Sequence, residues 1–318
     1  MNPNDKIYIA GHRGLAGSAI VRRLHNDGYS NVIVRTRAEL DLTDQRAVHA
    51  FFQTQRPEYV FLAAAKVGGI FANDAYPAEF VHQNLAIQTN VIHEAWRSDV
   101  KRLLFLGSSC IYPRECPQPI KEEYLLTGPL EATNRPYALA KIAGIEMCWS
   151  YNRQYGTQFL CAMPTNLYGP GDNYDLNTSH VLPALIRKMH ETKQRGDKEV
   201  VVWGTGKPRR EFLHSDDLAT ALLHLMNLPE APTRELFGNP EQPPLINVGT
   251  GTDVTIAELA TLIAEVIGFK GAITFDTSKP NGTPRKMLDV SRVCKLGWRY
   301  GTELSTGLQT TYSDFLKR

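Results

Sequence analysis

Lys6-Ile-Tyr-Ile-Ala-Gly-His-Arg-Gly-Leu-Ala-Gly17 joins a short β-prone run directly to a glycine loop. The residues from 15 to 27 predict a helix that stops at Gly28 and has an apolar face formed by Ala16, Ile20, Val21 and Leu24. Strand, glycine loop and helix in this order favour a dinucleotide site, because glycines let the backbone approach a pyrophosphate and the helix N-terminus supplies unpaired N–H groups. The spacing Gly-x-x-Gly-x-x-Gly is a relative of the more familiar Gly-x-Gly-x-x-Gly, and an ordinary glycine turn is the alternative interpretation.

Strands and helices alternate after this unit. Strands are expected at 31–34, 58–65 and 103–106, and helices at 45–56 and 78–98, an order typical of a doubly wound parallel sheet. We therefore predict an α/β fold with a Rossmann-type doubly wound parallel sheet over residues 1–170 and a returning segment at about 211–250. Residues 171–210 and 251–318 are predicted to form a smaller, discontinuous α/β lobe that binds the substrate. Further helices are expected at 136–155, 181–190, 213–226, 254–268 and 304–316, and further strands at 159–163, 200–203 and 246–249.

Composition argues against several classes of protein. The 318 residues include 35 Lys and Arg and 33 Asp and Glu, and the formal charge of +2 gives no general reason to expect nucleic acid or an anionic membrane as a partner. The longest apolar run, 59–65, cannot span a bilayer, and the polar N-terminus precedes too few apolar residues for a signal peptide. Five cysteines without a Cys-x-x-Cys pair indicate reduced thiols and no metal site. We expect a cytoplasmic protein.

The end of the second predicted strand bears on the choice of cofactor. An NAD site has an acidic residue there, which bonds the adenosine ribose, but this chain has Arg-Thr-Arg at 35–37. A guanidinium pairs with a 2′-phosphate in a bidentate way, so Arg37, together with Arg13 in the glycine loop, favours NADPH over NADH. A solvated basic strand end is the alternative interpretation, and Glu39 and Asp41 lie nearby in the sequence.

The fourth predicted strand and the helix at 136–155 supply candidates for catalysis. The apolar run 103–106 ends in Gly107-Ser-Ser-Cys110, and the carboxyl end of such a strand is where open α/β sheets bind their ligands. Tyr137 and Lys141 are four residues apart, so one helix face presents both. An ammonium beside the phenol is expected to lower the pKa of Tyr137 from about 10, which suits a group that passes a proton to a carbonyl oxygen. A solvated Tyr–Lys pair is the alternative interpretation.

Ser108, Tyr137 and Lys141 in this order, after a dinucleotide loop, resemble the extended short-chain dehydrogenase/reductase family, as does Pro164-Thr-Asn-Leu-Tyr-Gly-Pro170. Blocks between residues 10 and 286 resemble the members that act on GDP-linked 4-keto-6-deoxyhexoses, among them Ala63-Ala-Ala-Lys-Val-Gly-Gly-Ile70, Ser179-His-Val-Leu-Pro-Ala-Leu185 and Gly282-Thr-Pro-Arg-Lys286. The resemblance implies NADPH contacts from the glycine loop and later segments, namely Gly11, His12, Arg13, Gly14, Leu15, Ala16, Gly17, Arg37, Asp41, Leu42, Leu106, Gly107, Lys141, Pro164, Thr165, Asn166, Leu167 and His180.

The resemblance implies that GDP-4-keto-6-deoxy-D-mannose is epimerised at carbons 3 and 5 and then reduced at carbon 4. Moving protons next to the ketone needs a base and an acid besides the tyrosine, and Cys110 and His180 are the candidates. A thiolate beside an imidazolium is expected to favour both charged forms. Ser108 and Tyr137 are expected to hold the oxygen on which enolate charge develops. The alternatives are a packing role for Cys110 and a helix-capping role for His180.

The resemblance also implies substrate contacts from Lys188, Trp203, Arg210 and Asn281. Positive charge and an indole suit a diphosphate and a sugar or base. Asn281 stands where the family has an acidic residue, so its amide keeps the acceptor and loses the charge. A local basic cluster consists of Arg209, Arg210, Arg285 and Lys286. Solvated surface is the alternative interpretation for Arg209 and Lys286.

The predicted helices at 78–98 and 136–155 each have a second apolar face, and the family suggests a homodimer through a four-helix arrangement. Three other functions fit parts of the pattern. A related GDP-sugar reductase or synthase without full epimerase activity is disfavoured because both Cys110 and His180 are present. A non-catalytic NADPH-binding sensor has no need of Tyr137 and Lys141. An NAD-dependent nucleotide-sugar epimerase that recycles its cofactor is disfavoured by Arg37.

Overall fold

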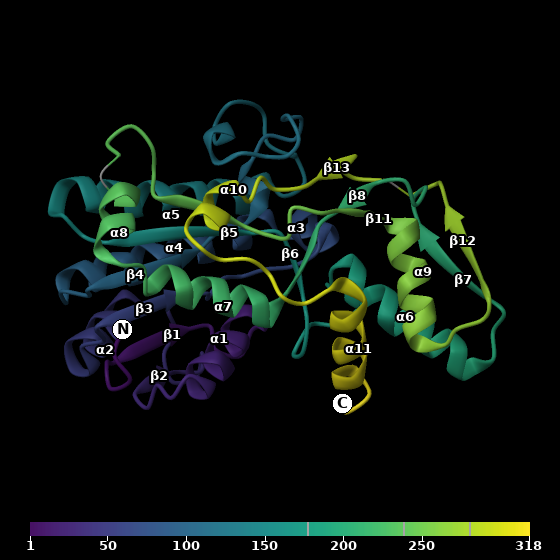
Figure 1. Cartoon of the computed structure of the whole chain (residues 1–318), viewed down its shortest axis with the longest axis horizontal. Coiled ribbons are helices and arrows are strands. Elements are labelled where there is room, and N and C mark those ends of the chain that lie inside the picture. The colour runs from purple at the N-terminus through teal and green to yellow at the C-terminus, as the bar shows by residue number, and fades with distance from the viewer. Residues whose placement is uncertain (177, 238, 280) are drawn as a thin grey trace.

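A six-stranded parallel sheet forms the centre of the molecule (Figure 1). The computed structural model describes residues 1–318 except 177, 238 and 280. The strands are arranged in the order β10-β5-β4-β3-β1-β2, and every neighbouring pair is parallel. Their bounds are β1 (Ile7–Ala10), β2 (Val32–Val34), β3 (Tyr59–Leu62), β4 (Arg102–Leu106), β5 (Phe159–Pro164) and β10 (Leu245–Val248). The Rossmann-type fold class predicted above is confirmed.

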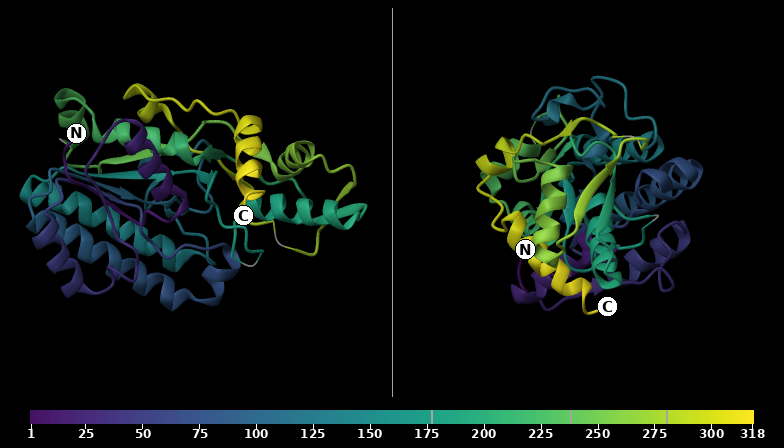
Figure 2. Two further views of the ribbon diagram at one scale, coloured as in Figure 1. Left: turned by 90° about the horizontal axis from the view of Figure 1, so that it is seen from below. Right: turned by 90° about the vertical axis from the view of Figure 1, so that its right-hand side faces the viewer.

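Helices cover both faces of this sheet, because strands buried on both sides need two apolar layers. One layer contains α1 (Leu15–Asn26), α7 (Ser215–Met226) and the short α10 (Ser291–Lys295). The other contains α2 (Gln45–Gln55), α4 (Pro77–Arg97) and α5 (Arg135–Tyr155), and the left view of Figure 2 shows these helices below the sheet. Each layer has its own hydrophobic cluster, so the sheet is a rigid platform for the loops at its carboxyl edge.

The second half of the chain adds three small sheets. The strand β7 (Glu199–Trp203) pairs with β12 (Ala272–Asp276), and β6 (Asn166–Tyr168) pairs with β9 (Phe212–His214). The third sheet contains β11 (Val254–Thr255), β8 (Arg209–Arg210) and β13 (Arg285–Lys286). Residues of α6 (Val181–Arg195), α9 (Ile256–Ile267) and α11 (Leu304–Phe315) pack into a separate hydrophobic cluster, seen at the right of Figure 1.

The predicted helices agree with the structure except near these small sheets. The helix expected at 213–226 begins at Ser215, because the residues before it pair with β6 as a strand. The helix expected at 254–268 begins at Ile256, where the Thr255 hydroxyl accepts the Glu258 amide in a capping box. The helix expected at 181–190 continues to Arg195 and stops at Gly196, which has a φ of +74°.

The remaining elements are short. They are α3 (Ile70–Ala75), α8 (Glu230–Phe237) and the 3₁₀ turns η1 (Ser109–Ile111) and η2 (Glu122–Tyr124). Within the described part of the chain, no helix combines the length and the apolar character needed to cross a bilayer.

Candidate active site

The carboxyl edge of the central sheet holds the candidate cofactor site. After β1 the chain leaves to β2 on one side and then to β3 on the other, and a ligand crevice forms where strand order reverses in this way. The loops after β1 and β3 touch, because the Ala63 amide donates to the Ala10 carbonyl at 3.0 Å. Gly11 has a φ of +90°, and a Cβ there would lie 2.7 Å from the Ala64 nitrogen. The loop after β1 therefore requires glycine at this position.

The N-terminus of α1 is suited to bind an anion. Gly14 is its N-cap, no side chain caps the helix, and the first turn has no acidic residue. The amides of the first turn, Leu15 to Gly17, have no acceptor within the helix. A Cβ on Gly17 would lie 2.1 Å from the Gly11 carbonyl oxygen, so the helix begins directly against the glycine loop. This arrangement suits a pyrophosphate, as the strand–loop–helix pattern predicts.

The end of β2 carries cations near the glycine loop. The Arg37 side chain is 73% exposed, with its Nε 3.5 Å from a carboxylate oxygen of Asp41. Hydrogen bonds from Thr36, followed by weaker effects of Arg35 and Arg13, lower the pKa of Glu39, which places Arg13 beside this strand end. Arg37 and Arg13 are thus available to a phosphate. The neighbouring Arg35 donates instead to the Val34 carbonyl at 2.7 Å, and the Leu42 carbonyl accepts from Asn90.

The strand exit after β4 and the first turn of α5 bring together four predicted catalytic residues. Lys141 is buried, and its Nζ donates to the Leu106 carbonyl at 2.8 Å and lies 5.8 Å from the centre of the Tyr137 ring. Ser108 caps η1, where its hydroxyl accepts the Cys110 amide at 3.4 Å. The Ser108 side chain also hydrogen-bonds to Tyr137, and Cys110 acts electrostatically on the same phenol.

The protonation of Tyr137 differs from the sequence-based expectation. Burial, followed by the neighbouring Cys110, raises the pKa of Tyr137 above its ordinary value of 10, and the hydrogen bond with Ser108 only partly offsets this. The expected lowering by Lys141 is therefore wrong for the protein without its ligands. Burial also lowers the pKa of Lys141 to about 8, because an ammonium loses hydration in this site. At neutral pH the phenol keeps its proton and the lysine keeps its charge.

The predicted pair of Cys110 and His180 is also uncharged. Burial raises the pKa of Cys110, although Lys286, Ser108 and Lys141 act in the opposite direction. His180 is an exposed residue at the N-cap of α6. Loss of hydration around its ring, followed by the charge of Lys286, nevertheless lowers its pKa. The expected thiolate–imidazolium pair is wrong, because desolvation favours the neutral form of each group. Lys286 also acts on both groups: it favours the Cys110 thiolate and disfavours the His180 imidazolium. The His180 side chain makes no cap hydrogen bond, so the helix-capping alternative is wrong too.

The loop after β5, proposed for the nicotinamide end, is held by its neighbours. The Thr165 amide donates to the Val248 carbonyl at 3.1 Å, and the Asn166 side chain donates to the Glu211 carbonyl at 2.8 Å. A Cβ on Gly107 would collide with the Met163 side chain at 1.9 Å, so the exits of β4 and β5 approach closely. Leu106, Gly107 and the segment 164–167 therefore share one edge of the sheet.

Glu211 is a structural residue that the sequence analysis missed. Its side chain is fully buried and accepts from the amides of Thr250 at 2.6 Å, Gly251 at 2.8 Å and Leu288 at 2.8 Å. Burial raises the pKa of Glu211, and the hydrogen bonds from the three backbone amides oppose that effect. The Glu211 carboxylate thereby connects the loop after β10 with the segment that follows β13, while the Glu211 carbonyl holds the loop after β5. An acidic residue directly after two arginines and before Phe212 was the available signal.

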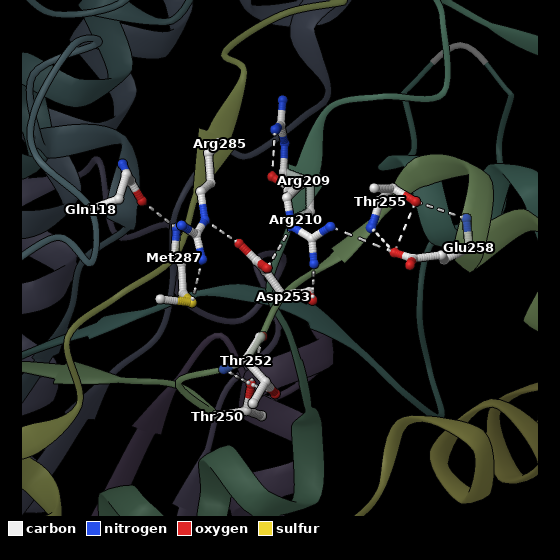
Figure 3. Close-up of polar contacts among 10 residues, drawn as sticks. All are labelled: Gln118, Arg209, Arg210, Thr250, Thr252, Asp253, Thr255, Glu258, Arg285 and Met287. Atoms are coloured by element: carbon white, nitrogen blue, oxygen red, sulfur yellow. Dashed lines mark hydrogen bonds and ion pairs between the residues drawn. The ribbon is translucent and has the colours of Figure 1, made fainter.

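The basic cluster divides into two faces of the small sheet. Asp253, whose side chain is 4% exposed, accepts from Arg209 Nε at 2.8 Å and from Arg285 Nε at 2.5 Å. Figure 3 shows both arginines pointing toward this carboxylate, which we call the Asp253 bridge, while Arg210 points away from it. Arg209 also lies 3.8 Å from Glu258. Arg209 is thus an ion-paired residue, which corrects the solvated-surface alternative.

The predicted substrate residues lie on α6, β7, β8 and the segment before β13. Lys188 donates through Nζ to the Val201 carbonyl, and Trp203 is 66% exposed beneath the Lys279 ammonium, 5.6 Å from its ring centre. A Cβ on Gly282 would lie 3.4 Å from the Arg210 guanidinium, so the 281–286 segment lies beside Arg210. The Asn281 amide oxygen accepts from the Thr205 amide at 2.8 Å and holds the turn after β7, an internal role that the sequence analysis did not foresee.

A cleft lies between the η1 turn, the loop before α5 and the segment that contains β13, and Arg285 is among its lining residues. Its lining includes Ser109 and Cys110 from η1, Glu131 and Asn134 from the loop before α5, and Thr283 and Lys286 from the segment that contains β13. The η1 turn, which carries the Cys110 thiol, therefore shares this cleft with cationic side chains of β13, a distant part of the chain. This combination of a dinucleotide loop, a Ser–Tyr–Lys group and a second acid–base set can transfer a proton and a hydride to a ketone.

Known proteins share both sequence and fold with this chain. A profile of the NAD dependent epimerase/dehydratase family matches residues 7–244. The GDP-L-fucose synthase of Escherichia coli strain K12 is 55% identical over 98% of this chain and 97% of the relative, and putative GDP-L-fucose synthase 2 of Arabidopsis thaliana is 56% identical over 100% and 93%. A solved GDP-mannoheptose C4 reductase from Campylobacter jejuni with NADP bound is 42% identical, covers 99% of each chain and has a TM-score of 0.89. The chain belongs to the NAD dependent epimerase/dehydratase family and, within it, to the GDP-L-fucose synthases.

Proposed function

We propose that this protein converts GDP-4-keto-6-deoxy-D-mannose to GDP-L-fucose, by epimerisation at carbons 3 and 5 followed by NADPH-dependent reduction of the 4-keto group. The observation that carries the proposal is the convergence of Ser108, Cys110, Tyr137 and Lys141 at one strand exit. The names of the relatives, which match over nearly their full length, support the substrate and product.

The residues of the first half of the cleft fit NADPH. The free amides at the start of α1 suit the pyrophosphate, and the exposed Arg37 suits a 2′-phosphate. NADPH, when bound, supplies the hydride for carbon 4. The similarity to a C4 reductase solved with NADP bound supports the same cofactor. The loop from Pro164 to Leu167, held against Glu211, gives the nicotinamide end a fixed wall.

The reduction is assigned to Tyr137, Ser108 and Lys141. Because its pKa is raised, the Tyr137 phenol is protonated and donates its proton to the 4-oxygen as the carbonyl carbon accepts the hydride. Ser108 donates a second hydrogen bond to that oxygen. The charged Lys141, held by the Leu106 carbonyl, stabilises the phenolate that remains.

The epimerisation is assigned to Cys110 and His180. One of them removes the proton next to the ketone, and the electrons of the C–H bond move to the 4-oxygen as an enolate. The other donates a proton to the opposite face of the same carbon. Ser108 and Tyr137 stabilise the enolate by hydrogen bonds, so one oxygen site serves both half-reactions. The neutral resting forms of Cys110 and His180 leave one proton on the thiol and a free lone pair on the imidazole.

The test is incubation with GDP-4-keto-6-deoxy-D-mannose and NADPH in deuterated water, with identification of the sugar. The wild-type protein is expected to consume NADPH and to give GDP-L-fucose with deuterium at carbons 3 and 5. Tyr137→Phe is expected to lose reduction by more than a hundredfold and to keep part of the exchange, whereas Cys110→Ser and His180→Gln lose exchange. Wild-type exchange in both of these variants would contradict the acid–base assignment.

A GDP-sugar reductase without full epimerase activity is the second candidate, because one similar solved structure is named a C4 reductase. That function would give a product with manno stereochemistry at carbons 3 and 5. A non-catalytic NADPH sensor would consume no NADPH with any GDP-sugar ketone.

We further propose the predicted two-lobe organisation, a cytoplasmic location and a homodimer through α4 and α5. The separate hydrophobic cluster built from residues 168–315 supports a distinct substrate lobe. On the outer side of the two packed helices, Leu139 is 48% exposed and Leu85 and Ile142 are only partly buried, which supports a further apolar contact. The homodimer is tested by the mass in solution, where a monomer would contradict it. Leu139→Glu is expected to weaken the dimer.

A further inference from the structure

Lys286 occupies the face of the small sheet that the Asp253 bridge does not use. The parallel strands β8 and β13 pair Arg285 with Arg209 and Lys286 with Arg210. Because side chains alternate along a strand, the two paired arginines share one face and Lys286 shares the other with Arg210. The Asp253 bridge fixes the first face, so it also fixes the side on which the Lys286 ammonium lies.

Within the described part of the chain no carboxylate forms an ion pair with Lys286, and the Glu131 carboxylate acts on it only as a weaker electrostatic influence. Among the described residues, its side chain has neither a hydrogen bond nor an ion pair, whereas Arg209 and Arg285 on the other face share Asp253. Lys286 is only partly exposed, and burial is the main cause of its lowered pKa. A buried, unpaired ammonium costs free energy, and such a group suits a site where negative charge appears during function.

Cys110 and Lys286 lie close enough to interact electrostatically. Both residues line the same cleft, although they lie 176 positions apart in the chain. Lys286 is the largest of the influences that favour the Cys110 thiolate, and Cys110 is the largest of those that favour the Lys286 ammonium. Other titratable groups also interact with these two residues. Lys141 and Tyr137 act on Cys110. The groups that act on Lys286 are Arg210, Cys116, Glu131 and His180.

We infer that Lys286 is the cation that stabilises the thiolate of Cys110, and that it makes Cys110 usable for proton transfer in the epimerisation. This inference rests on the proposed function. When Cys110 donates its proton to carbon, the S–H bond breaks, the enolate electrons form the C–H bond, and negative charge remains on sulfur. In the reverse direction the thiolate takes the proton and the enolate oxygen receives the electrons. In either direction the charged sulfur lies beside Lys286, which acts through Cys110 as a positioning residue.

The test measures the Cys110 thiolate directly and needs no substrate. Thiolate absorbance at 240 nm is titrated against pH for the wild-type protein and for Cys110→Ser, and the difference isolates Cys110 from the other four cysteines. The same pair is prepared with Lys286→Gln. We expect the midpoint of Cys110 to rise by about one pH unit without Lys286, which is tenfold less thiolate at a fixed pH. Lys286→Arg keeps the charge and is expected to retain most of the wild-type midpoint.

Two controls keep this test decisive. Lys207→Gln removes an equal charge from an exposed position between β7 and β8 and is expected to leave the midpoint unchanged. The melting temperature of Lys286→Gln is expected to equal or exceed that of the wild type, because an unpaired buried charge is removed. A structural role for Lys286 would instead lower the melting temperature and leave the midpoint in place. A midpoint within 0.3 units of wild type in Lys286→Gln overturns the inference.

The catalytic readout separates this inference from the proposed function. In Lys286→Gln, deuterium exchange at carbons 3 and 5 is expected to fall at least tenfold, with part of the loss recovered at high pH. A wild-type protein that makes no GDP-L-fucose would refute the proposed function and would leave the thiol titration valid. A raised thiol midpoint with unchanged exchange would overturn the role in epimerisation.

Discussion

At the proposed cofactor side, the loop after β1 offers backbone amides and glycines, whereas at the proposed sugar side the strands β8 and β13 offer charged side chains. Gly11, Gly14 and Gly17 permit a close approach of loop to helix, and no side chain caps α1. Across the cleft, Glu211 and Asp253 are buried carboxylates that each hold two or more segments together.

The difference follows from how each half is assembled. The residues of the glycine loop are consecutive, so one strand–loop–helix unit sets their geometry. Those of the sugar side come from segments around residues 188, 203, 210 and 286, and strands of two residues bury little apolar area to hold them. Charged hydrogen bonds then supply the order that hydrophobic packing supplies elsewhere. Substitutions that remove charge are therefore expected to damage the sugar side. Substitutions that add side-chain volume are expected to damage the cofactor side.

The largest effect is expected for Glu211→Ala. Three backbone amides, one buried and two part-buried, lose their acceptor at about 1–3 kcal/mol each, so the free energy of unfolding should fall by about 3 kcal/mol or more. Urea denaturation measures this loss. Glu230→Ala removes an exposed pair with Arg234 and is expected to change stability by less than about 0.5 kcal/mol. Equal, small losses in both variants would refute the role given to Glu211.

Gly17→Ala tests the cofactor side. Its Cβ would meet the Gly11 carbonyl oxygen at 2.1 Å, so the loop must move, at a cost of about 1–3 kcal/mol, and affinity for NADPH should fall at least tenfold. Fluorescence titration with NADPH measures the affinity. Gly301→Ala is the matched control, because the φ of Gly301 is not positive and its Cβ would come no closer than 3.8 Å to the described atoms around it, at a carboxylate oxygen of Asp217. Unchanged NADPH affinity in Gly17→Ala would show that the loop is not tightly constrained.

The smallest effect is expected for a buried carboxyl in the segment that follows β6. One oxygen of Asp172 has no partner among the described residues, and burial raises its pKa from 3.8 to about 7. The folded protein therefore holds this proton more tightly than the unfolded chain, and stability falls as pH rises from about 4 to 7. Asp172→Asn should be more stable than wild type by about 1–2 kcal/mol at pH 8, with a smaller difference at pH 5.

Thermal denaturation at both pH values provides the measurement. A difference between Asp172→Asn and wild type that does not change with pH would show that the carboxyl ionises normally in the folded protein.

Much of the fold and part of the site are predictable from sequence. The alternation of apolar strands with amphipathic helices predicts the parallel sheet, because both faces of its strands are buried. The helix from Pro136 onward could be placed from its proline and from the spacing of Tyr137 and Lys141. The short strands β6, β8, β9, β11 and β13 of the second half were not predicted, because segments of two or three residues have too little periodicity to distinguish them from loops.

The protonation states of the site residues and their partners from distant parts of the chain could not be predicted from the sequence either. The sequence suggested that Lys141 lowers the pKa of Tyr137 and that Cys110 pairs with His180. Burial reverses the first expectation, and Lys286 replaces the partner in the second. Neither depends on sequence spacing, since desolvation is a property of the complete fold.

The sequence by itself determined which side chains this protein has for its chemistry, and it ordered the strand, loop and helix that hold the cofactor. Contacts between neighbours along the chain are enough for that purpose. Only the tertiary structure decided that Arg209 and Arg285 neutralise Asp253 while Lys286 lines the same cleft as Cys110. The physical reason is that strand pairing and burial, which join residues far apart in the chain, set both the face on which each charge lies and the free energy of that charge.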